Sequence, residues 1–247
     1  MGKIKNGLFY FTCFIIAILF ANCKSTLKEV PILLFNGTGT SPNDVEAIKN
    51  ILSSNDMDFE LVNTAQLNEL DTNDLKKYKL IIIPGGNFIE IGKSLTVETA
   101  HNIQAAVHGG LNYLGICAGG FLAGNTQNNS FNIAGDTQFK FYSAEDKGIR
   151  KTALAVTNAD GVMIEHYWED GPQFSGWGEV VSKYPDGSPA TVEGSYGSGW
   201  VVLTGVHAEA PESWRKEFHF STSTTNSHQY AIQLIKAAMK KTVLPHF

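Results

Sequence analysis

A glycine-rich segment around one cysteine, Gly115-Ile116-Cys117-Ala118-Gly119-Gly120, constrains the fold of this chain more than any other feature. It follows an apolar run that is typical of a strand, and a helix is predicted after it. A strand that turns sharply into a helix leaves little room two residues before and after the turn, and glycine stands at both places. This is the pattern of a nucleophile elbow, which puts a thiol at a helix N-terminus, where backbone dipoles favour the thiolate. The alternative is a strand, turn and helix with a chance cysteine.

Apolar runs and amphipathic stretches alternate along the first half of the chain. Continuous apolar runs are typical of strands buried on both faces, and apolar residues three and four apart are typical of helices. Ser41 followed by Pro42 is a strong helix start. The expected strands are 30–35, 59–62, 80–83 and 111–116, and the expected helices are 42–53, 95–107 and 227–241.

From Phe131 onward the texture changes to short alternating segments separated by Gly, Asp and Pro. These segments predict strands and hairpins attached to the same core. The expected strands there are 150–157, 179–183, 190–193 and 200–204. The whole pattern predicts an α/β fold with a doubly wound, mostly parallel, flavodoxin-like sheet and extra C-terminal β-hairpins.

The N-terminus has the pattern of a targeting signal. Lys3 and Lys5 precede an uncharged, mostly apolar run over 8–21, which suits a signal peptide better than a transmembrane helix. The run ends before Cys23 in a sequence that resembles a bacterial lipobox, so Cys23 is the expected lipidation site. We predict a signal peptide over 1–22, a tether over 23–29 and one domain over 30–247, exported and membrane-anchored at the periplasm or cell surface. A secreted protein with a plain signal peptide and an uncleaved anchor are the alternatives.

The cysteine count supports a special position for Cys117. Of the three cysteines in the chain, Cys13 would leave with the signal peptide and Cys23 would carry lipid. An exported protein with one remaining thiol has no disulfide framework. Cys117 is therefore either a functional thiol or a small buried hydrophobic residue.

Partners for that thiol are expected at the ends of other strands. His207 follows the strand 200–204 and could act as a general base, and Glu209, two residues on, could orient its imidazole. Gly85 and Gly86 follow the strand 80–83. Ligand sites in such sheets gather at the carboxyl ends of strands, so these glycine amides and that of Ala118 are expected to bind an oxyanion or substrate.

These segments together resemble the class I glutamine amidotransferase-like superfamily. Within it, the chain is similar to the biotin-protein ligase N-terminal-like family, over about 30–215. The residues that carry the resemblance are Gly115–Phe121, Tyr167–Phe174 (Tyr-Trp-Glu-Asp-Gly-Pro-Gln-Phe) and Gly205–Glu209. The resemblance implies the superfamily's α/β fold, with Cys117 as nucleophile, His207 as base, Glu209 as its orienter and Gly86 as an oxyanion donor.

Two residues depart from the superfamily pattern. Phe121 stands where glutamine-hydrolysing members carry a glutamine, and Ala208 stands where a proline is usual between the histidine and the glutamate. The first departure argues against glutaminase activity. Biotin ligation is not expected either, because the chain is too short for a ligase domain and shows no Gly-Arg-Gly-Arg-type motif.

The expected function is a cysteine-nucleophile hydrolase or amidase that acts on a C–N bond of a small molecule or peptide. The alternative is a ligand-binding module without turnover on the same scaffold. A net charge of −5 with two arginines gives no basic patch, so nucleic acid is not an expected partner. The histidines lack metal-ligand spacing. Glu165-His166 and Glu169-Asp170 are expected in a solvated loop, and a cation site is the alternative for them. We expect neither a metal nor a cofactor, and membrane contact only through the N-terminal lipid.

Overall fold

The computed structural model describes residues 1, 2 and 31–247, and its centre is a nine-stranded mixed sheet. The strand order is β2-β1-β3-β4-β11-β10-β9-β6-β7. The predicted signal peptide, tether and lipidation site at Cys23 lie outside the described residues, apart from residues 1 and 2. The strands are β1 (Ile32–Phe35), β2 (Phe59–Val62), β3 (Leu80–Ile83), β4 (Asn112–Ile116), β5 (Lys140–Phe141), β6 (Lys151–Asn158), β7 (Met163–Glu169), β8 (Pro172–Gln173), β9 (Glu179–Lys183), β10 (Pro189–Tyr196) and β11 (Gly199–Thr204).

Five neighbouring strands, from β2 to β11, form a parallel sheet in the order expected of a flavodoxin-like fold. Strand β1 is buried on both faces. Ile32 and Leu34 pack in one core cluster, and Leu33 and Phe35 pack in another. Successive side chains of a strand point to opposite faces, so a continuous apolar run is what this position requires.

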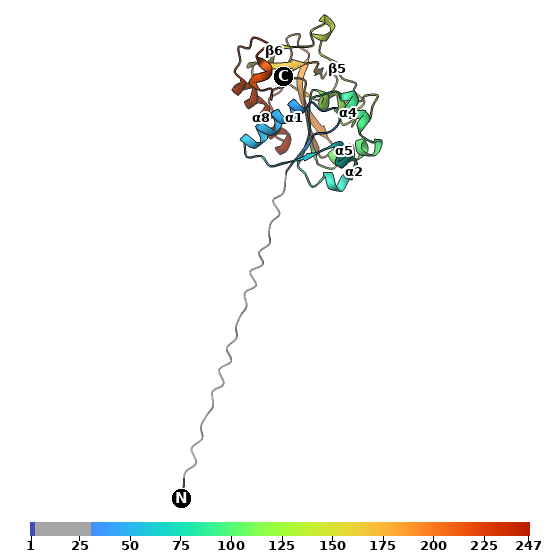
Figure 1. Cartoon of the computed structure of the whole chain (residues 1–247), viewed down its shortest axis with the longest axis vertical. Helices are drawn as coiled ribbons and strands as arrows, with labels where there is room; N and C mark the ends of the chain where they lie inside the picture. The colour runs from blue at the N-terminus through green and yellow to red at the C-terminus, as the bar shows by residue number, and fades with distance from the viewer. Residues whose placement is uncertain (3–30) are drawn as a thin grey trace.

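Helices cover both faces of the parallel sheet. Helices α1 and α8 lie on one side, and α2, α4 and α5 lie on the other (Figure 1). Ser41 caps α1 and Pro42 is its first residue, as predicted. The helices are α1 (Pro42–Ser54), α2 (Thr64–Glu69), α3 (Thr72–Leu75), α4 (Phe88–Ser94), α5 (Val97–His108), α6 (Ala118–Ala123), α7 (Glu212–Arg215) and α8 (Thr224–Lys240), with a 3₁₀ turn, η1, at Glu145–Lys147.

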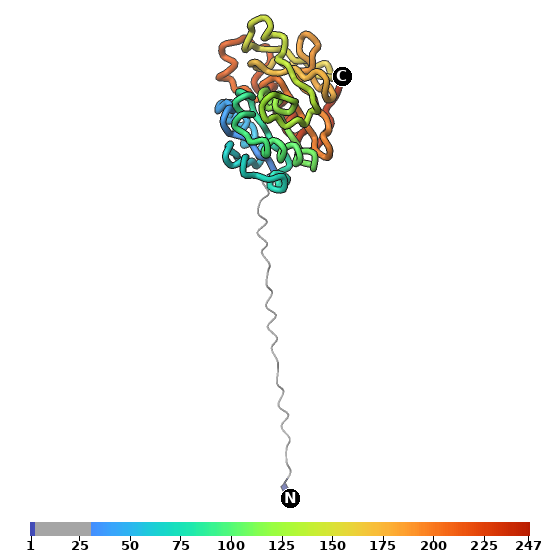
Figure 2. The backbone as a smooth tube through the Cα atoms, turned by 90° about the vertical axis from the view of Figure 1, so that its right-hand side faces the viewer, coloured from blue at the N-terminus to red at the C-terminus, as the bar shows by residue number. Residues whose placement is uncertain are grey.

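The C-terminal strands are attached to the same core, as predicted, and include antiparallel hairpins. Strands β10, β9, β6 and β7 pair antiparallel and continue the parallel sheet beyond β11. A short antiparallel pair, β5 with β8, stands apart from it. The β6–β7 segment, coloured yellow, lies at the end of the molecule opposite α2 and α5 (Figure 2).

The sequence did not predict β7. We expected Glu165-His166 in a solvated loop, and this was wrong: both residues lie in β7, and His166 is fully buried. The expectation failed because β7 pairs along its whole length with β6, and the histidine side chain is covered by α8.

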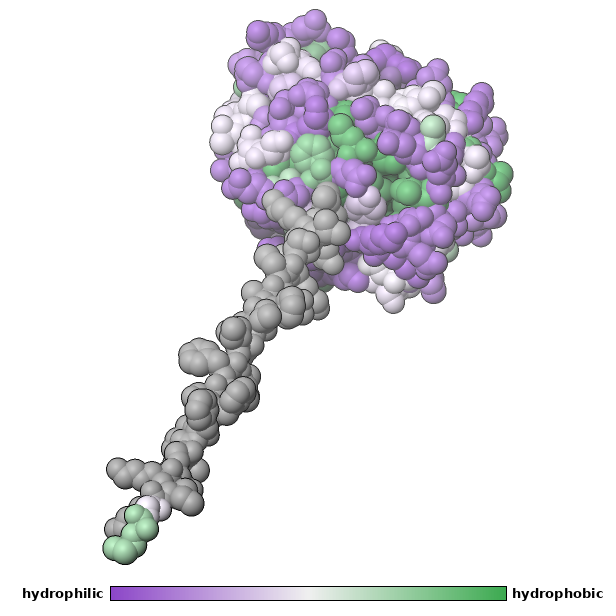
Figure 3. Space-filling model, turned by 60° about the horizontal axis from the view of Figure 1, so that its bottom comes forward, coloured by the Kyte–Doolittle hydropathy of each residue, from purple (hydrophilic) through white to green (hydrophobic). Residues whose placement is uncertain are grey.

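The face seen in Figure 3 is largely hydrophilic, with a group of apolar residues near its centre. Within residues 1, 2 and 31–247, no helix has both the length and the apolar character needed to cross a bilayer.

Candidate active site

Cys117 lies at the sharp turn between β4 and α6. Its backbone has φ 49° and ψ −102°, a strained conformation for a residue with a side chain. Its N–H donates to the carbonyl of Thr204 at 2.8 Å, which joins the ends of β4 and β11. A Cβ on Gly115 would lie 2.6 Å from the carbonyl oxygen of Gly119, and one on Gly119 would lie 2.1 Å from that of Ile83. The predicted nucleophile-elbow backbone is therefore present, and its two glycines are required by close backbone contacts.

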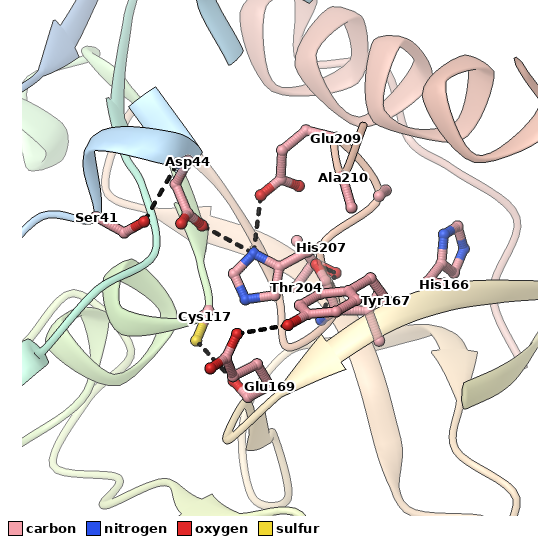
Figure 4. A network of polar contacts seen from close by, with 12 residues as sticks. Ser41, Asp44, Cys117, His166, Tyr167, Glu169, Thr204, His207, Glu209 and Ala210 are labelled. Atoms are coloured by element: carbon pink, nitrogen blue, oxygen red, sulfur yellow. Dashed lines mark hydrogen bonds and ion pairs between the residues drawn. The ribbon is translucent and has the colours of Figure 1, made fainter. Parts of the chain in front are cut away.

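His207 follows β11 and faces the same pocket as Cys117. The pocket has a volume of about 440 Å³ and is lined by both side chains. The backbone N–H of His207 donates to the backbone carbonyl of Tyr167 on β7 at 2.8 Å, which fixes the backbone of the loop after β11. Its ring nitrogen Nδ1 lies 2.9 Å from Oε1 of Glu209. The other ring nitrogen, Nε2, lies on the side of the ring toward Cys117 and Glu169 (Figure 4).

A second carboxylate, which the sequence analysis missed, also contacts the imidazole. Oδ1 of Asp44 lies 2.9 Å from Nδ1 of His207, and Asp44 is only 5% exposed. Asp44 is in the first turn of α1, where an acidic residue is ordinarily explained by the helix dipole. The available signal was its place after β1, at the sheet edge where the other site residues gather.

The two carboxylates determine the charge of the imidazole. Burial by itself lowers the pKa of His207, but the charges of Asp44 and Glu209, together with Cys117, outweigh burial and raise that pKa well above its usual range. Burial raises the pKa of Asp44, but the nearby positive charge of His207 outweighs burial and lowers that pKa overall. Nδ1 carries one proton, which the Glu209 hydrogen bond uses, so Oδ1 of Asp44 remains without a hydrogen bond of its own. His207 is thus a buried imidazolium between two carboxylates.

The strand β7 supplies the opposite wall of the pocket. The Cys117 thiol lies 3.5 Å from the backbone carbonyl oxygen of Glu169 and can donate a hydrogen bond to it. The Glu169 side chain accepts a hydrogen bond of 2.7 Å from the Tyr167 hydroxyl. Sequence reasoning used this segment for the resemblance and expected Glu169-Asp170 in a solvated loop, because its pairing with β6 was not predicted. Glu169 is instead the last residue of β7, and both residues line the pocket.

The predicted glycines lie beside this pair. Gly86 lines the pocket with Cys117 and His207. Gly85 lies behind the histidine, where a Cβ would be 2.2 Å from Oδ1 of Asp44 and 2.7 Å from Cε1 of His207. Ala118 is the first residue of α6, so its amide belongs to the helix turn whose N–H groups lack helical partners. The structure thus brings the predicted residues to one sheet edge. Glycine is required at position 85 because a side chain there would clash with Asp44 and His207.

A buried chain of hydrogen bonds supports the loop that carries His207 and Glu209. Ser227 on α8 donates to the carbonyl of Ala208 at 3.0 Å, and its oxygen is 2.8 Å from Nδ1 of His166. Burial, together with the charge of Arg215, lowers the pKa of His166 to about 3, so this ring is neutral. Nδ1 of His166 therefore donates to Ser227, and the chain anchors the peptide between the two functional residues.

The imidazole of the site and its two carboxylates have the donor types of a metal site. Asp44, His207 and Glu209 are buried, and their donor atoms lie within 4.8 Å of one another. Ligands bound about 2.1 Å from a tetrahedral zinc ion are about 3.4 Å apart, whereas both carboxylates lie 2.9 Å from the imidazole nitrogen. These distances are those of direct ion pairs, so we interpret the group as a charged support for His207.

The family model of the biotin-protein ligase N-terminal region matches residues 30–161. The chain belongs to this family. A biotin–protein ligase of Schizosaccharomyces pombe (strain 972 / ATCC 24843) is 26% identical over 159 residues, which are 53% of this chain and 25% of that protein. The chain thus matches about a quarter of the length of that ligase.

Solved structures similar to this family member show the fold. A glutamine amidotransferase has a TM-score of 0.60 at 18% identity, covering 83% of this chain and 99% of the other. A putative GMP synthase protein from Thermoplasma acidophilum has a TM-score of 0.52 at 13% identity, covering 86% and 96%. The fold is therefore class I glutamine amidotransferase-like, as predicted.

Proposed function

We propose that this biotin-protein ligase N-terminal family member is a cysteine-nucleophile hydrolase that cleaves a C–N bond in a small molecule or peptide. The observation that carries the proposal is the strained Cys117 elbow, which shares one pocket with a histidine held by two buried carboxylates. Strain of this kind costs about 1–3 kcal/mol and concentrates at functional sites. A buried structural cysteine needs neither the positive φ nor the charged histidine.

In the proposed resting state Nε2 of His207 has already taken the Cys117 proton, so the pair is a thiolate and an imidazolium. The sulfur attacks the carbonyl carbon, and the C=O electron pair becomes an oxyanion. The amides of Gly86 and Ala118 are proposed to bind the oxyanion, with Gly85 leaving space for the imidazole. The intermediate collapses as His207 gives its proton to the departing amine, and water then hydrolyses the thioester. Glu209 and Asp44 stabilise the imidazolium that each step requires.

The reactivity of Cys117 tests this proposal. The full chain is treated with iodoacetamide between pH 6 and 9, and alkylation is measured by mass spectrometry on the peptide that contains Cys117. The separate peptide is needed because Cys13 and Cys23 also react. We expect rapid labelling near neutral pH that falls at least tenfold in His207→Gln, since the imidazolium supports the thiolate.

The matched control is His101→Gln, which alters an exposed histidine on α5. It should label like the wild type. Slow wild-type labelling, or labelling unchanged in His207→Gln, would contradict the proposal.

A ligand-binding module without turnover is the second candidate, and one contact favours it. The Cys117 sulfur lies against the Glu169 carbonyl, and Cys117 is 6% exposed. In a pure binding module the thiol would stay protonated and donate a hydrogen bond to that carbonyl, and alkylation would follow the pH dependence of an ordinary thiol. The same iodoacetamide profile therefore separates the two functions.

We also propose, from the N-terminal sequence, that the domain works outside the cytoplasm on a lipid attached at Cys23. The basis is the apolar run over 8–21 and the lipobox-like sequence that follows it.

A further inference from the structure

The pocket of Cys117, here called the thiol pocket, opens beside a larger side pocket of about 580 Å³. The two share four lining residues: Phe88, Ile89, Phe121 and Phe141. Together they have the size of a site for an extended ligand. A substrate as small as free glutamine would leave the side pocket empty.

The shared wall is aromatic. The Phe121 ring stacks on Phe88 with centroids 4.5 Å apart and packs against Phe141 at 4.8 Å. Ile89 is 40% exposed beside them. Phe121 is buried, whereas Phe88 and Phe141 are partly exposed. The exposed parts of these rings and Ile89 offer contact area to an aromatic or branched apolar substituent, and they offer no partner to a carboxylate or amide.

Beyond the rings the lining becomes acidic. The carboxylates of the side pocket are Glu145, Asp146 and Asp186, and its one cationic residue is Lys140. The thiol pocket adds Asp44, Glu169 and Asp170.

The arginine at this junction is already neutralised. Arg150 lies 3.0 Å from Glu145 and 2.6 Å from Asp170. Asp186 accepts hydrogen bonds from the Ser143 and Ser188 hydroxyls at 2.7 and 2.6 Å, which stabilise its charged form. With Glu145 and Asp170 paired to Arg150 and Asp44 paired to His207, the lining still has Asp146, Asp186 and Glu169 against one cation, Lys140. This excess of negative charge favours a cationic ligand over an anionic one.

The histidine sets the direction in which a substrate lies. A third, small pocket of about 210 Å³ is also lined by His207, together with Tyr167 and Trp214, which do not line the thiol pocket. The departing amine must receive its proton from His207, so it leaves on that side. The acyl part then extends away from the histidine, past Phe121 and into the side pocket, which His207 does not line.

We infer that the acyl part of the substrate carries an aromatic or branched apolar group next to the scissile carbonyl and a positive charge beyond it. The proposal rests on the proposed function, since Cys117 fixes where the carbonyl lies. The substrate class is a basic, aromatic peptide or an amide of similar chemistry.

Three matched peptides test this inference on the full chain with Cys117→Ala, in which no turnover can occur. They are N-acetyl-Lys-Phe amide, N-acetyl-Glu-Phe amide and N-acetyl-Lys-Ala amide, titrated by calorimetry. We expect the first to bind about tenfold more tightly than the third, as burial of an aromatic ring predicts. It should also bind at least threefold more tightly than the second, with a preference that weakens as salt is added. The same titrations on the wild type check that the substitution has not altered the pocket.

A charge reversal locates the effect. Asp146→Lys in the side pocket should abolish the preference for lysine over glutamate, and Glu69→Lys, at an exposed position of α2, should leave it unchanged. Equal binding of the lysine and glutamate peptides, or of the phenylalanine and alanine peptides, would overturn the inference. Loss of binding does not decide whether Cys117 is a nucleophile, because the iodoacetamide profile of the wild type tests that separately.

Discussion

Replacing Asp44 by asparagine should weaken the thiol chemistry and leave the fold intact. Asp44 and Glu209 lie at the same distance from Nδ1 of His207, but Glu209 accepts the hydrogen bond and Asp44 contributes only charge. Asparagine has nearly the same shape, so the substitution removes charge without opening a cavity. The imidazole keeps its orientation through Glu209.

The size of the effect follows from what is removed. A hydrogen bond or close contact with a charged group contributes about 1.5–3 kcal/mol, and each 1.4 kcal/mol is a factor of about ten. We therefore expect the rate of Cys117 alkylation at pH 7 to fall by about 10- to 100-fold. The difference should shrink above about pH 8.5, where an ordinary thiol ionises without help.

The stability of Asp44→Asn should change little. Two buried carboxylates face one imidazolium, and Asp44 has an oxygen without a hydrogen bond, so removing its charge removes a desolvation cost as well as an attraction. We expect a change of less than about 1 kcal/mol in the free energy of unfolding, or a Tm shift of less than about 4 °C.

The pH dependence of stability has a defined sign. A group whose pKa is raised in the folded state stabilises the protein fully below its unfolded pKa, and this stabilisation is lost as the pH rises through the raised value. For His207 the loss begins above about pH 6.5, and in Asp44→Asn it should be complete at a lower pH than in the wild type.

The rate of Cys117 alkylation is measured by mass spectrometry, and the stability is measured by thermal unfolding. Both are measured between pH 5 and 9 on the same samples. The reasoning is refuted if Asp44→Asn alkylates at the wild-type rate at pH 7. It is also refuted if the variant loses stability in proportion to its loss of reactivity, because Asp44 would then be a structural residue.

Three further outcomes follow from the site. The full chain should release no ammonia from millimolar glutamine, because the ring of Phe121 cannot replace the hydrogen bonds of a polar side chain, worth about 1–3 kcal/mol; turnover above about one per second that is lost in the Cys117→Ala control would refute this. Cys23→Ser should move the protein from membranes to a soluble fraction, and fatty-acid labelling unaffected by the change would exclude the lipobox. Gly119→Ala should lower the free energy of unfolding by about 3 kcal/mol or more, measured with urea, because its Cβ would lie 2.1 Å from the Ile83 carbonyl oxygen; unchanged stability would show that the elbow tolerates side chains there.

Local chemistry explains which parts of the fold were predictable. The strand predicted at 80–83 has those limits in the structure, because its apolar run is buried on both faces. The start of α1 was predictable because Ser41 and Pro42 act within one turn of the chain. The elbow was predictable because Gly115 and Gly119 are required by contacts of the same turn and its neighbouring strand.

The rest of the site depends on contacts between distant segments. Asp44 contacts His207 only because α1 begins, and the loop after β11 lies, at the same sheet edge. This proximity cannot be read from residue spacing. The sequence missed β7 because alternating polar and aromatic residues such as Glu165 and Tyr167 are ambiguous without the β6 partner. The His166–Ser227 contact joins β7 to α8 across 61 residues, so a buried, neutral histidine could not be predicted from its polar neighbours.

The two departures from the amidotransferase pattern have different consequences in this structure. Ala208 contributes its carbonyl oxygen to Ser227, and a proline at this position would present the same acceptor, so the loop that holds His207 does not need the usual residue. Phe121 cannot be exchanged for the usual glutamine in the same way. Its ring is part of the wall between the thiol pocket and the side pocket, and it stacks on Phe88. A glutamine there would replace a stacked ring with a polar amide that has no partner among those rings. The residues proposed to activate the thiol, His207 and the glutamate that follows Ala208, therefore follow the superfamily pattern, whereas Phe121 in the pocket wall does not. This combination is what the proposed hydrolase needs for a substrate with a larger, apolar acyl group.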